Sequence, residues 1–165
     1  PDISEFGLVE RSLLNRPEPG EKAANMTLQS FLDQRGRTYR RDMSSPLSAQ
    51  NACSRLSPFI SVGCISIRQI LHRTKKKLDV VKVNPRGKEN IGWTGSLTSF
   101  QSRLAWHCHF IQRLEVELTL DSVAMNPEID LHLNRSMDDR RYHAWANGET
   151  GWPFFDACML SLIHI

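Results

Sequence analysis

The sequence lacks the features that mark several large classes of protein. No apolar run approaches the roughly 20 residues that a membrane-spanning helix needs, so no membrane segment is expected. No Gly-x-Gly-x-x-Gly or Walker-type loop is present, so neither of these common phosphate-binding loops is indicated. No stretch of any length alternates apolar and polar residues as a strand would. What remains is helical periodicity, and the predicted fold class is all-α.

The cysteines form no recognisable metal or disulfide framework. Cys53, Cys64, Cys108 and Cys158 are widely spaced, and none belongs to a Cys-x-x-Cys pair. We interpret them as buried, reduced thiols of a cytoplasmic protein, with a disulfide framework or a zinc site as the alternatives. His107 and His109 flank Cys108, but neighbouring helical side chains point about 100° apart and cannot converge on one ion. No metal site is therefore predicted.

Charge is unevenly distributed along the 165 residues. Residues 1–103 hold 17 Lys and Arg against 9 Asp and Glu, a net charge of +8, whereas residues 104–165 hold 4 against 9, a net charge of −5. The basic part contains two clusters, which are Arg35, Arg37, Arg40 and Arg41, and then Arg73, Lys75, Lys76 and Lys77. Such clusters suit a polyanionic partner, and they equally suit a solvated surface.

Helical periodicity is strongest in two segments. Residues 21–34 place Ala24, Leu28, Phe31 and Leu32 on one face, and Gly36 ends the pattern. Residues 96–118 carry one apolar stripe of Leu97, Phe100, Leu104, Cys108 and Ile111, with Trp106 and Phe110 on a second face. A helix that is apolar on two faces is usually buried between neighbours or lines a pocket.

Capping signals place the shorter helices. Ser57 and Ser66 are expected to begin two helices, with Pro58 in the first turn of one and Ile67, Ile70 and Leu71 facing inward on the other. A helix over 137–147 should end at Gly148, and Pro153 should open another that the chain barely enters. Residues 37–53, 79–95 and 119–135 are predicted as connections.

The sequence contains two candidate ligand-binding features. The segment from Cys53 to Pro58 places two hydroxyls and a guanidinium beside a predicted helix start, where a phosphate would be favoured, although a simple capped turn has the same composition. Trp106 is either an ordinary core residue or a stacking platform for a base. No catalytic residue is predicted, because no Ser-His-Asp arrangement can be argued from spacing.

Four ordered motifs between about residues 19 and 159 resemble the FAD-binding domain of photolyases and cryptochromes. The first is Gly20-Glu-Lys-Ala-Ala24 with Phe31, Leu32 and Tyr39, and the second is Ser54-Arg-Leu-Ser-Pro-Phe59 with Val62-Gly-Cys-Ile-Ser66 and Arg68. The third is Ser99-Phe-Gln-Ser-Arg-Leu-Ala-Trp106. The fourth runs from Ala144-Trp145 through Gly148, Thr150-Gly151 and Pro153 to Asp156-Ala157. The run Trp106-His-Cys-His-Phe110 resembles a bacterial branch of this family.

The resemblance implies a multihelical domain that binds FAD. Cofactor-contacting residues, carried over by position, would be Tyr39, Cys53, Ser54, Arg55, Leu56 and Ser57, and lesion-contacting residues would be Arg103 and Trp106. Cys53 stands where the family usually has Thr, and Arg103 stands where it usually has Glu or Gln. Photolyases use light-excited reduced flavin to pass an electron to a pyrimidine lesion in DNA, whereas cryptochromes use the flavin for signalling.

The resemblance also implies a division of the chain. Residues 1–18 would be a linker from a missing N-terminal α/β domain, and 19–159 the first half of the helical FAD-binding domain. Residues 160–165 we interpret as translated sequencing-adapter sequence. Truncated at both ends, the fragment is expected to be inactive and to expose apolar surface, because the complete FAD pocket needs the missing C-terminal half.

The function expected of the parent follows from the same resemblance. It would be a monomeric, cytoplasmic photolyase-like enzyme that binds DNA with pyrimidine lesions and no membrane. The alternatives are a cryptochrome-type photoreceptor without repair activity and an unrelated helical DNA-binding domain without flavin.

Overall fold

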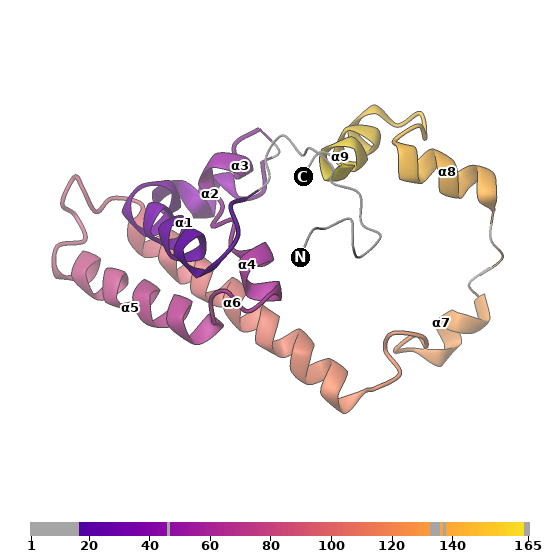
Figure 1. Ribbon diagram of the computed structural model, residues 1–165, viewed down its shortest axis with the longest axis horizontal. Coiled ribbons are helices and arrows are strands. Elements are labelled where there is room, and N and C mark those ends of the chain that lie inside the picture. Colours follow the sequence, from indigo (N-terminus) through magenta and orange to yellow (C-terminus); the bar gives the residue numbers. More distant parts are fainter. Residues whose placement is uncertain (1–16, 46, 133–135, 137, 164–165) are drawn as a thin grey trace, which may run out of the picture. The chain divides into compact units, whose positions relative to one another are not determined.

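The structure, a computed structural model, describes residues 17–45, 47–132, 136 and 138–163. Apart from Pro17 and Glu18, the predicted linker over 1–18 lies outside the described residues. Every regular element in the described ranges is a helix, which confirms the all-α prediction (Figure 1). The chain divides into two compact units, Glu18–Met125 and a second whose described helices all follow Met125.

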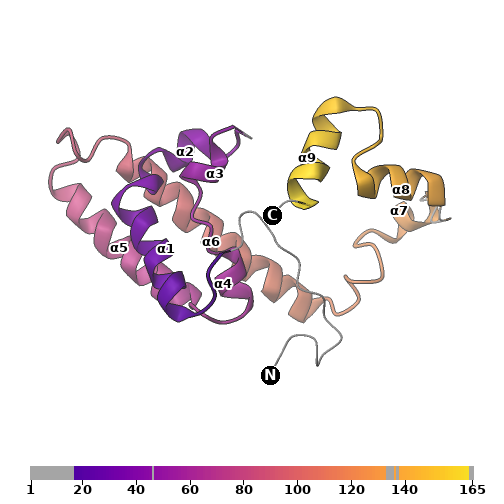
Figure 2. The same ribbon diagram turned by 45° about the horizontal axis from the view of Figure 1, so that its top comes forward.

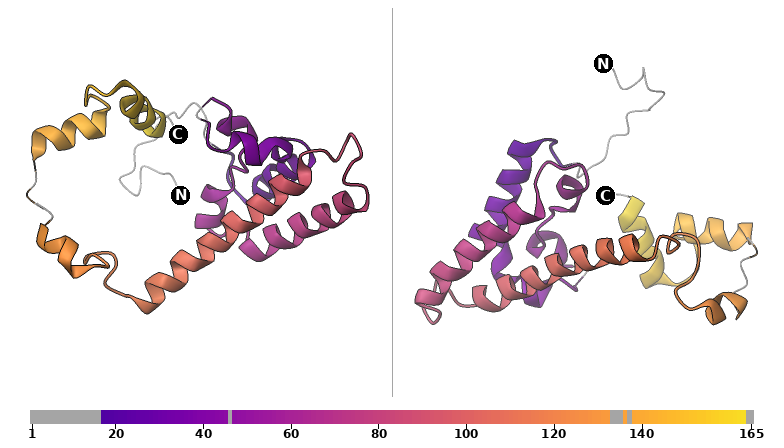
Figure 3. Two further views of the ribbon diagram at one scale, coloured as in Figure 1. Left: turned by 180° about the vertical axis from the view of Figure 1, so that it is seen from behind. Right: turned by 90° about the horizontal axis from the view of Figure 1, so that it is seen from below.

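Three long helices build the first unit. They are α1 (Glu21–Asp33), α5 (Ile67–Val83) and α6 (Trp93–Val116), and α5 and α6 run side by side in opposite directions (Figure 2 and Figure 3). Four short elements lie around them, which are the 3-10 helix η2 (Arg35–Thr38), α2 (Tyr39–Asp42), α3 (Ala49–Ala52) and α4 (Ser57–Ser61). The core between them consists of Ala24, Leu28, Phe31, Leu32, Tyr39, Leu56, Phe59, Ile65, Ile70, Leu78, Val81, Trp93, Leu97, Phe100 and Leu104.

The first helix ends where the sequence indicates, but the chain beyond it is more ordered than predicted. All four apolar positions of the predicted α1 face are buried. A Cβ on Gly36 would lie 2.7 Å from the carbonyl oxygen of Phe31, so the glycine allows η2 to fold closely against α1. The prediction of a loop over 37–53 is wrong, because α2 and α3 each bury a side chain, Tyr39 and Ala52. Tertiary packing stabilises such one-turn helices without any periodic signal.

The two predicted serine caps have different outcomes. Ser66 caps α5 in a capping box, in which its Oγ accepts from the Gln69 N–H at 3.2 Å and its own N–H donates to Gln69 Oε1 at 2.8 Å. The predicted cap at Ser57 is wrong, since Leu56 holds the N-cap position of α4 and Ser57 is its first helical residue. Pro58 lies in the first turn, as expected.

The loop predicted over 79–95 is shorter in the structure, because α5 ends later and α6 begins earlier than predicted. α5 continues to Val83 because Leu78 and Val81 are buried against the core. α6 begins at Trp93, one residue after Gly92, whose φ of 89° is a left-handed conformation that glycine adopts without strain. In the predicted α6 stripe Leu97, Phe100 and Leu104 are buried, whereas the later members, Cys108 and Ile111, are exposed.

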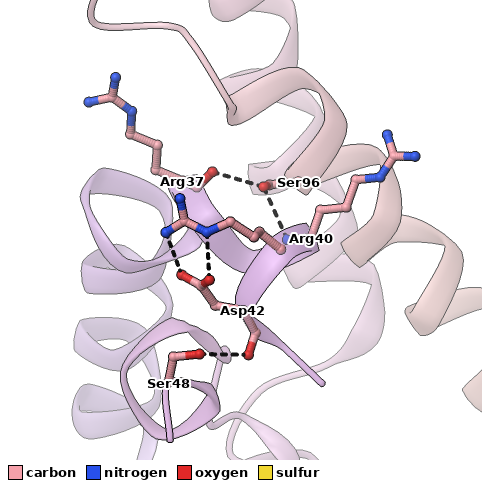
Figure 4. A network of polar contacts seen from close by, with 6 residues as sticks. Arg37, Arg40, Asp42, Ser48 and Ser96 are labelled. Atoms are coloured by element: carbon pink, nitrogen blue, oxygen red, sulfur yellow. Dashed lines mark hydrogen bonds and ion pairs between the residues drawn. The ribbon is translucent and has the colours of Figure 1, made fainter. Parts of the chain in front are cut away.

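One hydroxyl joins α6 to the short elements near Arg37. Ser96 Oγ donates to the carbonyl of Arg37 at 2.8 Å and accepts from the backbone N–H of Arg40 at 3.2 Å (Figure 4). Ser96 is buried, so both contacts satisfy polar groups that water does not reach. The contacts hold η2 and the start of α2 against the first turn of α6.

The described part of the second unit contains α7 (Pro127–His132), α8 (Asp139–Asn147) and α9 (Pro153–Ile163). Asp138 caps α8 by accepting from the Arg141 N–H at 3.1 Å, and Gly148 ends it in a left-handed conformation, as predicted. Pro153 begins α9, which the chain enters more deeply than expected. α7 lies within the predicted 119–135 connection.

A carboxylate closes the turn between α8 and α9. Asp156 accepts from the Thr150 N–H at 2.9 Å, from Thr150 Oγ1 at 2.5 Å and from the Gly151 N–H at 3.0 Å. These hydrogen bonds hold the pKa of Asp156 below its usual value, with the Thr150 hydroxyl as the largest cause. The turn is therefore stabilised by an ionised Asp156.

The burial of the four cysteine side chains agrees only in part with the prediction. Cys53 and Cys64 are half-buried, whereas Cys108 and Cys158 are exposed, and all four are free. The interpretation of all four as buried is therefore wrong for the later two.

Candidate functional site

The predicted cofactor segment connects α3 to α4 and follows an unusual backbone path. Cys53 is extended, Arg55 has a φ of 60° in the left-handed region, and Leu56 returns to a right-handed conformation. A left-handed φ in a residue other than glycine is uncommon and costs of order 1–3 kcal/mol. The turn at Arg55 directs Leu56 into the core, where it is 1% exposed, and leaves the Arg55 side chain at the surface.

Arg35 holds this segment in place. Its guanidinium donates to the carbonyls of Cys53 and Ser54, the latter at 3.3 Å, and to the carbonyl of Thr27 in α1 at 3.0 Å. Burial, followed by the charge of Arg55, lowers the pKa of Arg35 from its ordinary value, while Cys53 raises it. Arg35 therefore braces the segment from inside and is not part of an open basic surface.

The segment presents hydrogen-bond donors with no partner of their own. Among the described residues, the backbone N–H groups of Ser54, Arg55, Leu56 and Ser57 have no acceptor, and neither serine hydroxyl has a partner. Adjacent residues of opposite handedness turn successive N–H groups toward one point, and such a concavity binds anions. Exposed Arg55, which also has no acidic partner in the described residues, adds a positive charge. These groups fit a phosphate.

Tyr39 lies behind the segment. Its ring is buried and packs edge-on against Phe31 and Phe100, with centroid distances of 5.7 and 5.6 Å. Burial raises the pKa of Tyr39, Cys53 raises it further, and the charge of Arg103 lowers it. The pKa of Tyr39 therefore responds to both Cys53 and Arg103.

Cys53 has the character of a packing residue. Burial raises the pKa of its thiol, and this effect outweighs the opposing influence of Arg55 and Arg35. Because the thiolate is the reactive form of cysteine, a neutral and half-buried Cys53 is a weak nucleophile.

The two predicted lesion-contacting residues lie one turn apart on α6 and are exposed. Trp106 is 51% exposed and contacts the rings of His109 and Phe110, with centroid distances of 5.6 and 5.8 Å. Arg103 and Trp106 line one end of a surface groove of about 530 Å³. The exposed ring is not an ordinary core residue of the first unit, and the stacking platform stays a prediction.

The arginine cluster is shared between structure and surface. Arg35 is turned inward, Arg37 donates to the carbonyls of Ile91 and Lys88, both at 2.8 Å, and Arg41 pairs with Asp42 at 2.7 Å. Only Arg40 of this cluster has no side-chain partner in the described residues. Sequence reasoning missed the role of Arg35, because no local signal reveals contacts with carbonyls 18 and 19 residues away.

Other features give no chemical centre. His107, Cys108 and His109 are exposed on α6, and no group of three metal-ligating side chains occurs in the described residues. Across the same residues, no helix is both long enough and apolar enough to cross a bilayer.

Comparison with known proteins supplies the class. Residues 100–165 match the family described as the FAD binding domain of DNA photolyase. The chain is 28% identical over 163 residues to a deoxyribodipyrimidine photo-lyase of Halobacterium salinarum, covering 98% of this chain and 32% of that protein. It is 30% identical over 145 residues to one of Streptomyces griseus, covering 88% of this chain and 28% of that protein.

A relative with another name has a similar percentage of identical residues. The chain is 28% identical over 165 residues to a cryptochrome DASH of Natronomonas pharaonis, covering 97% of this chain and 31% of that protein. The chain thus spans about a third of the length of the curated relatives it matches. The all-helical fold and these matches define an FAD-binding helical domain. The chain belongs to the photolyase/cryptochrome family.

Proposed function

We propose that residues 19–159 form the first half of the FAD-binding domain of a photolyase-like flavoprotein that repairs pyrimidine lesions in DNA. The supporting observation is the set of backbone N–H groups over Ser54–Ser57 that have no acceptor among the described residues. Arg55 adds a positive charge to this segment, and Arg35 holds the segment in place. The names of the relatives, which include deoxyribodipyrimidine photo-lyases, support the choice of reaction.

In this proposal the segment holds the diphosphate of FAD. The backbone N–H groups of Arg55, Leu56 and Ser57 donate to phosphate oxygens, and Arg55 adds a charge-assisted contact. Tyr39 contacts the phosphate side of the cofactor, and the half-buried thiol of Cys53 takes the place of a hydroxyl donor. Bound reduced flavin supplies, under blue light, the electron that a photolyase passes to the lesion.

On the DNA side, Trp106 offers an exposed ring to an extruded base, and Arg103 offers a fixed positive charge beside it. A carboxylate at position 103 could accept a hydrogen bond from a base, whereas a guanidinium can only donate. Arg103 therefore favours acceptor groups, such as carbonyl oxygens or phosphates, at this point.

A cryptochrome-type photoreceptor is the second candidate, because a cryptochrome DASH is among the relatives. Both candidates require FAD, and only the first requires light-dependent repair. Blue-light repair of a lesion-containing oligonucleotide by the parent protein therefore separates them.

Equilibrium titration with FAD and with riboflavin tests the phosphate assignment in a chimera, in which residues 19–159 replace the matching segment of a complete photo-lyase and the C-terminal half of the pocket is present. Because riboflavin lacks phosphates, FAD should bind more tightly, and Arg55→Gln should weaken FAD binding about tenfold without affecting riboflavin. Arg86→Gln, which removes an exposed charge from the loop before α6, should leave both affinities unchanged. Equal effects of the two variants, or equal binding of both flavins, would remove the support for a phosphate site.

A further inference from the structure

A single hydroxyl of α6 contacts the backbone on both sides of Tyr39. Ser96 Oγ donates to the carbonyl of Arg37, two residues before Tyr39, at 2.8 Å. The same oxygen accepts from the backbone N–H of Arg40, the residue after Tyr39, at 3.2 Å (Figure 4). Ser96 is 2% exposed, so water does not replace either contact. The backbone that carries Tyr39 is therefore fixed to the first turn of α6.

The ring of Tyr39 is fixed to the same helix. Phe100 follows Ser96 by four residues and so lies on the same face of α6. The Phe100 ring packs edge-on against Tyr39 at a centroid distance of 5.6 Å, and Phe31 of α1 packs against it at 5.7 Å. Backbone and side chain of Tyr39 thus have separate contacts with α6, and the direction of its hydroxyl depends on both.

The hydroxyl of Tyr39 is left for a ligand. Tyr39 is 8% exposed, yet no group of the described residues forms a hydrogen bond with its hydroxyl. Polar groups of buried residues usually have a partner, so an unpaired hydroxyl on a fixed ring is a feature of a binding position. This agrees with the proposed contact between Tyr39 and the phosphate side of FAD.

The start of α6 approaches η2 closely enough for a serine to reach both backbone groups. A Cβ on Gly92 would lie 3.0 Å from the carbonyl oxygen of Arg37, which leaves no room for a larger residue there. The Arg37 guanidinium donates to the carbonyls of Ile91 and Lys88, both at 2.8 Å, and so holds the preceding loop against η2. At this spacing the short side chain of Ser96 completes the contact.

We propose that Ser96 is a positioning residue for FAD, which acts by directing the Tyr39 hydroxyl toward the phosphate side of the cofactor. The inference rests on the proposed function, from which it takes the contact between Tyr39 and FAD. Ser96 acts through Tyr39 and not by touching the cofactor. Without its hydroxyl, the carbonyl of Arg37 and the N–H of Arg40 lose their buried partner, and the backbone between them should move to regain one.

A second buried hydroxyl supplies a matched control. Thr74 is 0% exposed, and its Oγ1 donates to the carbonyl of Ile70 at 2.8 Å within α5. Thr74→Val removes a buried hydroxyl, as Ser96→Ala does, but the hydroxyl that it removes has no contact with the backbone beside Tyr39. Loss of stability common to the two variants measures the loss of a buried hydroxyl. An effect confined to Ser96→Ala measures the position of Tyr39.

The first experiment is a double-mutant cycle in the chimera with a complete photo-lyase. Ser96→Ala should weaken FAD binding about fivefold and leave riboflavin binding unchanged, because only the phosphate side is affected. Tyr39→Phe should weaken FAD binding by a similar factor. The double variant should bind no more weakly than Tyr39→Phe alone, since both changes remove the same contact. Ser96→Thr, which keeps the hydroxyl, should retain the affinity, and Thr74→Val should change it less than about twofold.

The second experiment follows the ionisation of Tyr39 in the full chain and needs no flavin. The sequence has two tyrosines, so Tyr142→Phe leaves Tyr39 as the only one. Burial raises the pKa of Tyr39, Cys53 raises it further, and Arg103 lowers it. If Ser96 keeps the ring in place, Ser96→Ala should expose it to water, and tyrosinate absorbance should appear at lower pH. The control variant should leave the titration unchanged.

Three results would overturn the proposal. One is unchanged FAD affinity in Ser96→Ala, and another is an equal loss of FAD affinity in Thr74→Val. The third is additive losses in the double variant with Tyr39→Phe, which would show that Ser96 does not act through the Tyr39 hydroxyl. A wild-type chimera that takes up no FAD would instead remove the proposed function. The positioning of Tyr39 by Ser96 would then be decided by the tyrosinate titration, and an unchanged titration would contradict it.

Discussion

Arg35 and Ser54 lie 19 residues apart in the sequence, and the guanidinium of Arg35 donates to the backbone carbonyl of Ser54 at 3.3 Å. The same guanidinium reaches Cys53 and Thr27, so one side chain joins α1 to the segment that the family resemblance assigns to FAD. The shape of this segment is therefore set by a residue outside it.

Arg35→Ala should lower the free energy of unfolding by about 2–3 kcal/mol, because it leaves carbonyls of a partly buried segment without a charged donor. FAD affinity should fall with it, since the donors of Arg55 and Leu56 would lose their fixed direction. Urea unfolding followed by circular dichroism measures the first effect. Arg86→Ala is the control, and equal stability of the two variants would contradict a bracing role.

Ser57→Ala and Ser66→Ala should affect different properties, the first FAD binding and the second stability. Ser66 caps α5, so its loss should reduce stability by about 1 kcal/mol and leave FAD binding unchanged. Ser57 is not a cap, so Ser57→Ala should leave stability nearly unchanged and weaken FAD binding. Thermal melts and flavin titrations of both variants check this, and destabilisation by Ser57→Ala would restore the capping interpretation.

The turn between α8 and α9 should be acid-sensitive. The pKa of Asp156 is below its usual value when folded, so its contribution is present above the unfolded pKa of about 4 and is lost as pH falls from there through the folded pKa. Tryptophan fluorescence of Trp145 and Trp152 should report loosening of the turn below about pH 4. Asp156→Asn should remove this pH dependence. An identical acid transition in the variant would show that another group is responsible.

The C-terminal half of α6 should bind an apolar dye. Phe110 is 64% exposed, and Ile111 and Leu114 are close to half-exposed, which leaves an unpartnered apolar surface in the described part of the unit. Phe110→Glu/Leu114→Glu should reduce dye fluorescence and aggregation without lowering the melting temperature, because neither side chain packs in the core. A large drop in melting temperature would mean that this face is packed in solution.

Periodic and capping signals predicted the framework well. The buried face of α1, the cap at Ser66 and the end of α8 at Gly148 were all predicted, because each depends on residues close in sequence. The one-turn helices α2 and α3 were missed, because their stability comes from burying Tyr39 and Ala52 against distant helices. The apolar stripe of α6 was predicted along its whole length, but periodicity alone does not show which of its residues are buried against other helices.

The residues of the candidate site were predicted from motif positions, whereas the structure adds their backbone conformation and contacts. The residues from Cys53 to Ser57 were chosen by resemblance, whereas their unpaired donors follow from the left-handed Arg55 and the brace from Arg35. Neither feature can be read from the segment itself, because a left-handed backbone at an arginine is atypical and the brace comes from another helix.

If this chain supplies the anchoring segment for FAD, that segment should work inside a complete relative. The most direct test replaces the matching segment of the Streptomyces griseus photo-lyase with residues 19–159, and measures flavin absorbance after purification and after FAD titration. The chimera should retain FAD, and Arg55→Gln in the same chimera should lower the retained fraction. A folded chimera that takes up no FAD, or one whose FAD affinity is unaffected by Arg55→Gln, would contradict it.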